Sequence, residues 1–431
     1  MKDNLTTHQL DNGLTILLKE IHTAPLFSCW IWYGIGSRNE LPGKTGLSHW
    51  VEHMQFKGTP NLSARQMDHT IARLGGQWNA FTSPDWTTYF ETLPANTLDV
   101  PLQMESDRMR NSLFDPLEVE TERTVILSER EGAENDPQFL LNEAVQSLAF
   151  ERHPYRNEVI GSQEDLRSLT REDLYGHYLN YYQPGNATLC LAGDFDSRQV
   201  LEKVHHYFDL IPTHEFTKSL PIPEETLPCF KEVELHGPGD TTFIQLAYRS
   251  PKADSDDFFA FTILESLLTG PSSLNMFGSG GISHRTSRLY LALVEKEIAV
   301  TVVGDLTATI DPSTFNFSLT AHPAHTTAEI IHRLDDQIES LQSNPVPQRE
   351  IDRAVKQAKA LFSYGSDNIT NQAFWMGYSN SFASYAWFTD YVERLSAVTP
   401  EEVMQVAQKY LMSDQRVVGI YRPTGEVQSL D

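Results

Sequence analysis

The sequence holds only three cysteines, Cys29, Cys190 and Cys229, and their spacing matches no metal-binding pattern. Three thiols cannot all pair with one another, which suits a reducing compartment. No apolar run approaches the roughly eighteen residues that a membrane-spanning helix needs. The N-terminal residues Met1–His8 have neither the apolar core of a signal peptide nor the arginine-rich character of a transit peptide. We therefore expect a cytoplasmic protein.

Basic residues are scarce relative to acidic ones. The chain has 33 Lys and Arg against 58 Asp and Glu, which gives a formal net charge of −25. Because the phosphates of nucleic acids demand a basic surface, this balance argues strongly against a nucleic-acid partner. An acidic surface can steer basic peptides, but solubility is the simpler explanation of the charge. At 431 residues, with 40% hydrophobic and 21% charged residues, the chain is long enough for two or three folded domains.

An internal repeat divides the chain. The segment Leu166–Leu174 reappears as Leu395–Val403, and the same offset of 229 residues relates the apolar pair Thr188-Leu189 to Val417-Val418. Each copy predicts a threonine-capped helix with acidic residues in its first turn, followed by a loop and a strand. A period this long indicates two homologous halves rather than a solenoid.

A polar stretch with several prolines joins the two halves. We expect a first half at residues 1–212, a proline-rich linker at 213–229 and a second half at 230–431. Strand and helix patterns interleave in each half without regular alternation, so the predicted fold class is α+β.

Two histidines and a glutamate lie close together within Gly46–Thr59. His49 and His53 are four residues apart, so on a helix their side chains lie one above the other and can bind one zinc ion. Glu52 lies on the same face, close enough to reach a water molecule at the metal. The order H-x-x-E-H is the inverse of the commoner zinc-peptidase motif. The pattern predicts peptide hydrolysis by a zinc-activated water.

The flanking residues favour a helix here. Gly46 and Ser48 suit a helix start, with Ser48 as the N-cap, and Lys57-Gly58-Thr59-Pro60 is a stop signal. A pattern of five residues can also arise by chance on an ordinary amphipathic helix, so the motif needs a third metal ligand to support it.

Candidates for the third ligand lie in Thr121–Glu131. Glu122 and Glu129 are seven residues apart, so on a helix they share a face. One can bind the metal while the other supports a ligand, but spacing alone does not choose between them. The run is equally typical of a long, charged, solvent-exposed helix.

The segment His49–Thr59 resembles the signature of the pitrilysin-type zinc peptidases, also called inverzincins. Within them it is similar to mitochondrial processing peptidase and its bacterial relatives. The run Val125-Ile126-Leu127-Ser128-Glu129 resembles the one that carries the family's third ligand. The likeness continues through Gly75–Thr82, His153-Pro154-Tyr155 and Val159-Ile160-Gly161, and it covers essentially the whole chain.

The resemblance implies one zinc ion per chain, bound by His49, His53 and Glu129. Glu52 would be the general base, and Glu122 would support a ligand from outside the ligand set. Each half would be a mainly antiparallel sheet with helices packed on one side, and the two halves would form a clamshell. Mn²⁺ or Co²⁺ can also occupy similar nitrogen and oxygen sites.

The segment Gly75–Thr82 is the candidate substrate edge, and the resemblance places it beside the zinc. A peptide would add to it as a strand, in contact with Asn79, Ala80 and Phe81. An ordinary core strand is the alternative, for Phe81 in particular.

The second half contains no H-x-x-E-H motif, so the zinc chemistry belongs to the first. Gly270–Gly281 predicts a flexible glycine-rich loop, because it lacks the Gly-Lys-Ser/Thr ending of a phosphate-binding loop. Ser287–Glu295 resembles a family helix, and its Arg288 is a candidate substrate contact. Many family members carry a tyrosine just beyond this helix, but Glu297–Thr301 has none.

The absent tyrosine leads to a hypothesis about partners. The chain would be the zinc-bearing subunit of a dimer in which a homologous subunit supplies the Arg/Tyr pair. A homodimer is the alternative. A different class of function is a catalytically retired peptide-binding or scaffold subunit, although such subunits lose the ligand set that this chain keeps complete.

Overall fold

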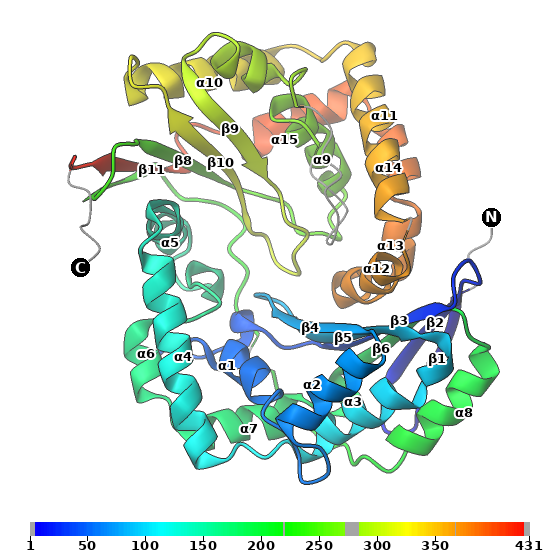
Figure 1. Ribbon diagram of the computed structural model, residues 1–431. Coiled ribbons are helices and arrows are strands. Elements are labelled where there is room, and N and C mark those ends of the chain that lie inside the picture. Colours follow the sequence, from blue (N-terminus) through cyan, green and yellow to red (C-terminus); the bar gives the residue numbers. More distant parts are fainter. Residues whose placement is uncertain (1–4, 219, 272–283, 367, 426–431) are drawn as a thin grey trace. The chain divides into compact units, whose positions relative to one another are not determined.

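Two β-sheets with helices packed against them organise the chain, so the fold is α+β as predicted (Figure 1). The computed structural model describes residues 5–218, 220–271, 284–366 and 368–425. The chain divides into two compact units, each built on one of the sheets. The first unit comprises Met1–Glu131, Asn157–Pro221 and Ser366–Phe388, and the second comprises Gly132–Arg156, Ile222–Gly365 and Thr389–Asp431.

The first sheet has six strands in the order β1-β2-β6-β3-β5-β4. Only β2 and β6 pair in parallel among its neighbours, and the other four pairs are antiparallel. The strands are β1 (Leu5–Gln9), β2 (Thr15–Glu20), β3 (Leu26–Tyr33), β4 (Gln77–Thr82), β5 (Thr87–Pro94) and β6 (Ala187–Gly193). A turn containing Asn12-Gly13 joins β1 to β2, with Gly13 at a φ of 90°.

Helices cover both faces of this sheet. Inward residues of β3, such as Cys29 and Ile31, join the main core, which also contains residues of α1. Trp30 and Trp32 alternate with them and pack on the other face against Phe374 of α12. The helices of this unit are α1 (Leu47–Met54), α2 (Ala64–Arg73), α3 (Asp99–Asn111), most of α4 (Pro116–Glu134), α6 (Gln163–Ser168), α7 (Arg171–Tyr181), α8 (Ser197–Phe208), α12 (Ile369–Phe382) and most of α13 (Tyr385–Thr389).

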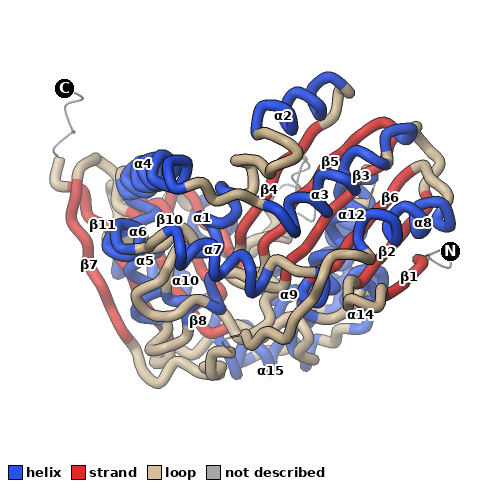
Figure 2. Tube along the Cα trace, turned by 90° about the horizontal axis from the view of Figure 1, so that it is seen from below, coloured by secondary structure: helices blue, strands red, loops and turns tan. Residues whose placement is uncertain are grey.

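Figure 2 shows α3 and α8 running along the strands of this sheet. The helix on the opposite face, α12, approaches β3 very closely at Gly377. A Cβ atom there would lie 2.0 Å from Nε1 of Trp32, so the contact requires glycine.

The second sheet has five strands in the order β7-β11-β8-β10-β9. Its one parallel pair is β7 with β11, so it repeats the arrangement β2-β6-β3-β5-β4 of the first sheet. The strands are β7 (Lys231–Gly237), β8 (Phe243–Arg249), β9 (Ala299–Asp305), β10 (Thr314–Ala321) and β11 (Arg416–Pro423). The helices of this unit are α5 (Pro137–Ala149), α9 (Asp257–Leu268), α10 (Thr327–Ser343), α11 (Gln348–Gly365), α14 (Tyr391–Ala397) and α15 (Pro400–Tyr410), with a π-helical turn at Tyr290–Val294.

The predicted sequence repeat is confirmed. Thr170 caps α7 and Thr399 caps α15, and each helix start is a capping box closed by an acidic residue, Asp173 or Glu402. The strands β6 and β11 follow the two helices at equivalent positions.

Each sheet is covered in part by a helix from the other half of the sequence. Helix α5 packs on the second sheet, although it lies in the first half of the chain, and α12 from the second half packs on the first sheet. The division into a first half at 1–212, a linker at 213–229 and a second half at 230–431 therefore stays a prediction. The compact units do not follow these boundaries, because α5 and α12 each belong to the unit of the other half. The predicted glycine-rich loop lies mostly outside the described residues, because 272–283 are not among them.

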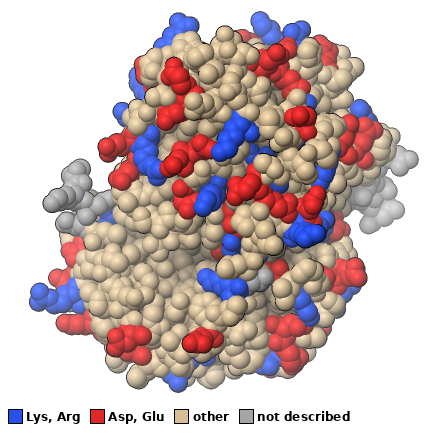
Figure 3. Space-filling view, turned by 180° about the vertical axis from the view of Figure 1, so that it is seen from behind, with Lys and Arg blue, Asp and Glu red and all other residues tan. Residues whose placement is uncertain are grey.

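The described residues bear on the predicted acidic character of the surface and on the predicted lack of a membrane-spanning helix. On the face drawn in Figure 3, Lys and Arg side chains lie singly or in small groups among Asp and Glu. Among the described residues, no helix is both long and apolar enough to cross a membrane. The cytoplasmic location stays a prediction.

Candidate metal centre

Helix α1 carries the H-x-x-E-H motif and has two distinct faces. Trp50, Val51 and Met54 are fully buried in the core of the first unit. His49, Glu52 and His53 lie on the other side of the helix and are partly exposed. The helix that the spacing predicts is confirmed.

The predicted N-cap is wrong. The N-cap of α1 is Gly46, whose φ of 89° is left-handed, and Ser48 lies inside the first turn. The Ser48 hydroxyl lies 3.2 Å from Nε2 of His177 on α7. Ser48 was a reasonable candidate by residue type, but the left-handed backbone at Gly46 places the helix start two residues earlier.

Helix α4 brings both candidate glutamates to this face of α1. Val119, Glu122, Ile126 and Arg130 are buried, so α4 is an amphipathic helix rather than a fully solvated one. Glu122 is 4% exposed, whereas the side chain of Glu129 is 50% exposed.

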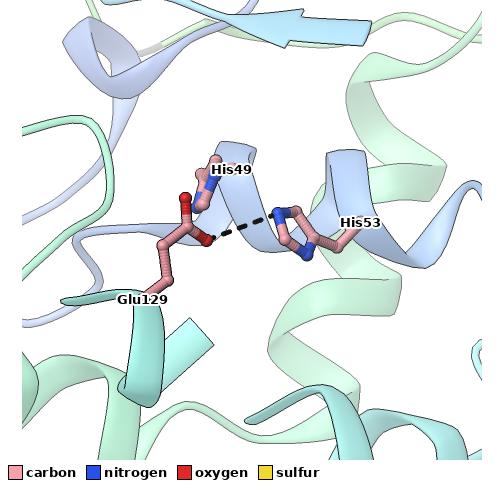
Figure 4. A group of neighbouring side chains, drawn as sticks. All are labelled: His49, His53 and Glu129. Carbon is pink, nitrogen blue, oxygen red and sulfur yellow. Dashed lines mark ion pairs between the residues drawn. The ribbon is translucent and has the colours of Figure 1, made fainter. Parts of the chain in front are cut away.

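His49, His53 and Glu129 come together (Figure 4). Each offers one donor atom, and these three atoms lie within 4.8 Å of one another. Among the described residues, this is the one group of three or more His, Cys, Asp or Glu side chains that could hold a metal ion. Two imidazole nitrogens and one carboxylate oxygen are the donor set of a catalytic zinc site with an open fourth position. The residues therefore fit a zinc ion.

Glu122 orients His53 from behind. Its Oε1 accepts a 2.7 Å hydrogen bond from Nδ1 of His53, while Nε2 of the same ring faces Glu129 at 3.8 Å. The second oxygen of Glu122 pairs with the Lys57 ammonium. Burial raises the pKa of Glu122, but the bonds from His53 and Lys57 outweigh this and lower it overall. Glu122 is thus an ionised acceptor that fixes the ring of His53, as carboxylates commonly do behind histidines that bind metals.

Replacing Glu122 with glutamine tests this support. Because the glutamine side chain would be a weaker acceptor and would not form an ion pair with Lys57, we expect zinc affinity to fall by about 10–100-fold. Competition with a chromophoric chelator measures the change. Glu120→Gln, an exposed change on the same helix, is the matched control. Unchanged affinity in Glu122→Gln would contradict the supporting role.

The general-base candidate Glu52 is held by a residue that the sequence did not single out. Its Oε2 accepts a short hydrogen bond from the hydroxyl of Thr82, the last residue of β4. Burial raises the pKa of Glu52, and the Thr82 bond opposes the rise. A carboxylate whose pKa is raised towards neutrality is a better proton acceptor during catalysis. Thr82 ends the segment that the family resemblance covers, but no spacing rule pairs it with Glu52.

The two histidines differ in basicity. Burial and the neighbouring His53 lower the pKa of His49 to about 4, so its imidazole is neutral at physiological pH. Burial also tends to lower the pKa of His53, but the Glu122 bond and the charges of Glu52 and Glu129 outweigh burial and raise it.

This difference predicts which residue releases a proton when metal binds. Metal binds the deprotonated imidazole, so zinc affinity should fall as pH falls through the raised pKa of His53, while His49 causes no loss until pH about 4. Calorimetry in buffers of different ionisation enthalpy counts the proton. In Glu122→Gln the release should move to lower pH, because the bond that raises the His53 pKa is lost. An unchanged pH dependence in that variant would contradict the assignment.

Two family models match the chain along most of its length. Residues 15–163 match the model described as Insulinase (Peptidase family M16), and residues 168–358 match the one described as Peptidase M16 inactive domain. The chain belongs to the pitrilysin-type M16 peptidase family.

Relatives within the M16 family extend over nearly the whole chain. Zinc protease PqqE of Helicobacter pylori is 27% identical over 427 residues, covering 96% of this chain and 92% of the relative. Mitochondrial-processing peptidase subunit beta of Neurospora crassa is 26% identical over 409 residues, covering 94% and 84%. A protease from Helicobacter pylori of known crystal structure superimposes with a TM-score of 0.89 at 26% identity, covering 98% and 100%.

A further solved structure shares the fold. A peptidase M16 inactive domain from Pseudomonas fluorescens has a TM-score of 0.87 at 18% identity, with 99% of this chain and 100% of that chain covered.

The predicted substrate edge lies at the end of the first sheet. Strand β4 is the last strand in the order and pairs only with β5 among the described strands. Asn79 is exposed, Ala80 is buried, and Phe81 is half-buried with its ring stacked on Phe90. The edge position is confirmed, and substrate contact by these three residues stays a prediction.

Arg288 belongs to the second unit. Its guanidinium pairs with Glu350 of α11 at 3.1 Å. A role for Arg288 in substrate binding stays a prediction.

Proposed function

We propose that this M16 chain is a zinc-dependent endopeptidase that hydrolyses unstructured peptides. The observation that carries the proposal is the convergence of His49, His53 and Glu129, with Glu52 on the same helix face and held by Thr82. The relatives named as zinc proteases support the same activity.

The chemistry divides among a few residues. His49, His53 and Glu129 would hold the metal, and a bound zinc ion would act as a Lewis acid that makes water nucleophilic at neutral pH. Glu52 accepts the proton of the attacking water and passes it to the nitrogen of the leaving amine. Thr82 keeps the carboxylate of Glu52 in one orientation, so that its other oxygen can take the proton.

Strand β4 offers a way to bind extended substrates. Its outer edge has no strand partner among the described strands, so a peptide could add there through main-chain hydrogen bonds. Because main-chain hydrogen bonds depend little on side chains, this mode of binding would accept peptides of many sequences. Because Thr82 ends β4 and bonds Glu52, a peptide along this edge would pass close to the general base.

We further propose that the chain works as the zinc-bearing subunit of a dimer. The support is the segment Glu297–Thr301, which lacks the tyrosine that a self-sufficient member would use and instead leads into β9 at Ala299. Loss of such a donor can lower a rate by about 10²–10³-fold. A homologous subunit that supplies an Arg/Tyr pair would restore it, and a homodimer is the alternative.

The second candidate function is a catalytically retired, peptide-binding or scaffold subunit. The residues that match the inactive-domain model, 168–358, do not include the H-x-x-E-H motif, which lies in the 15–163 match. The presence of His49, Glu52, His53 and Glu129 favours catalysis, because a scaffold has no need of a general base.

Mass spectrometry of a mixture of unstructured peptides tests the proposal. The zinc-loaded chain should cut internal bonds, and a chelator should abolish the cuts until zinc is added back. If the chain binds one zinc ion but cuts nothing, it either needs a partner subunit or is a scaffold. Addition of a homologous subunit distinguishes these two explanations. Restored cleavage would indicate a split catalytic site, and continued inactivity would favour the scaffold function.

A further inference from the structure

The helix that carries the metal motif has no side-chain cap of its own. The N-cap of α1 is Gly46, and the first N–H groups of any helix lack partners within it. Glu40, in the loop before the helix, supplies the missing acceptors. Its Oε2 accepts from the Gly46 N–H at 2.8 Å, and its Oε1 accepts from the Ser48 N–H at 2.7 Å.

Glu40 is buried as it makes these bonds. The residue is only 6% exposed, and both carboxylate oxygens accept hydrogen bonds. Burial raises the pKa of Glu40 to about 7, although the bonds from the Ser48 and Gly46 N–H groups oppose the rise. In its ionised form this carboxylate accepts stronger hydrogen bonds than a neutral group would. A negative charge at a helix N-terminus also interacts favourably with the partial positive charge there.

Neighbouring residues fix the same turn of chain from other directions. Asp165 accepts from both the backbone N–H and the hydroxyl of Thr45, just before the helix. At Gly46 a Cβ atom would lie 2.5 Å from the carbonyl oxygen of Ile160, so only glycine permits this close contact. The first turn of α1 is therefore held on several sides, and Glu40 holds it through the backbone.

The bonded N–H of Ser48 belongs to the residue immediately before His49. Helix α1 has only eight residues, and a helix this short depends on its surroundings for order. A loosened first turn would move His49 first, while His53 would remain bonded to Glu122 on α4.

We propose that Glu40 is a positioning residue for the metal centre, which fixes the start of α1 and so holds His49 in place relative to His53 and Glu129. The inference rests on the proposed zinc site, but it does not require the chain to be catalytically active. The competing explanation is that Glu40 stabilises the unit without influencing metal geometry.

Glu40→Gln separates the two explanations. Glutamine keeps the shape of the side chain but has one acceptor oxygen, so its NH₂ group would face one of the two helix N–H groups. We expect about 10-fold weaker zinc binding, in the range seen when supports of metal ligands are removed. We also expect an altered visible spectrum of the Co²⁺-loaded chain and faster hydrogen exchange at the amides of α1 in the metal-free chain.

Glu224→Gln is the matched control. Glu224 lies in the second unit and accepts from three backbone N–H groups, those of Glu151, Arg152 and His153, at 3.0, 2.8 and 2.9 Å. Removing its charge should lower the melting temperature but leave zinc affinity, the Co²⁺ spectrum and α1 exchange unchanged.

Wild-type zinc affinity and a wild-type Co²⁺ spectrum in folded Glu40→Gln would overturn the proposal. If that variant does not fold, Glu40→Asp keeps the charge but withdraws both oxygens by one methylene, and the same measurements apply to it. A wild-type chain that binds zinc but cuts no peptide would refute the proposed catalysis and leave the Glu40 result standing. A wild-type chain that binds no zinc would overturn both the proposed catalysis and the positioning role of Glu40. This holds whatever hydrogen exchange shows about the start of α1.

Discussion

Replacing Glu52 with glutamine should abolish most peptide hydrolysis while the chain still binds one zinc ion. Glutamine cannot accept the proton of the attacking water, and a positioned general base typically contributes about 10²–10⁴-fold to a rate. The Thr82 hydroxyl can still donate to the amide oxygen of glutamine, so the local structure should persist. The loss should appear in kcat rather than KM, because the carboxylate acts in the transition state rather than in substrate binding.

The measurement combines steady-state kinetics on an internally quenched peptide with zinc content per chain. Glu120→Gln is again the matched control, because Glu120 is exposed and pairs with Arg123 on the surface of α4. Two results would contradict the assignment. Wild-type kcat in Glu52→Gln would require a different base, and loss of zinc would make Glu52 part of the metal site.

Much of the candidate metal centre was predictable because its parts are local in sequence. The four-residue spacing of His49 and His53 has one meaning on a helix, so the shared face followed once the helix was predicted. The seven-residue spacing of Glu122 and Glu129 likewise placed both on one side of α4. Spacing could not separate their roles, and the family resemblance assigned them.

The structure gives a physical basis for that assignment. Glu122 is buried, with Lys57 as a counter-ion and Nδ1 of His53 as a donor, so its oxygens are already used. Glu129 is half exposed and faces the other nitrogen of the same ring. Glu122 thus bonds Nδ1 of His53, and Nε2 of the same ring remains on the side of Glu129, where the two could share a metal ion.

The residues that sequence reasoning missed all act across long separations or through the backbone. Thr82 reaches Glu52 from a strand thirty positions along the chain. Glu40 binds the first N–H groups of α1 from outside the helix, whereas the sequence pointed to Ser48 as the cap. Lys57 lies beyond the end of α1, within the predicted stop signal, and its partner Glu122 comes from another helix.

The sequence pattern also could not predict that α5 and α12 each pack on the sheet of the other half. Both helices have apolar residues that must be buried, and periodicity identifies an apolar face without naming the sheet that covers it. For α12 the specific evidence is the stacking of Phe374 against Trp30 and Trp32 and the glycine at 377, which are visible only in the fold.

Replacing Glu129 with alanine should remove zinc from the chain without unfolding it. Loss of one of three protein ligands should weaken binding by more than the roughly 100-fold that loss of a supporting residue can cause. Because the Glu129 side chain is half exposed, the melting temperature of the metal-free chain should hardly change. Zinc content after gel filtration and chelator competition measure the binding, and Glu131→Gln on the same helix is the matched control.

Thermal unfolding with and without zinc then distinguishes the two glutamates. A ligand that binds only the folded state stabilises it by about 4 kcal/mol at a thousand times its Kd, so zinc should raise the melting temperature of the wild-type chain. Glu129→Ala should lose that rise and keep the metal-free stability. Glu122→Gln should keep part of the rise and lose metal-free stability, because it leaves Lys57 without its buried partner. The opposite pattern would exchange the roles of the two residues, making Glu122 the ligand and Glu129 its support.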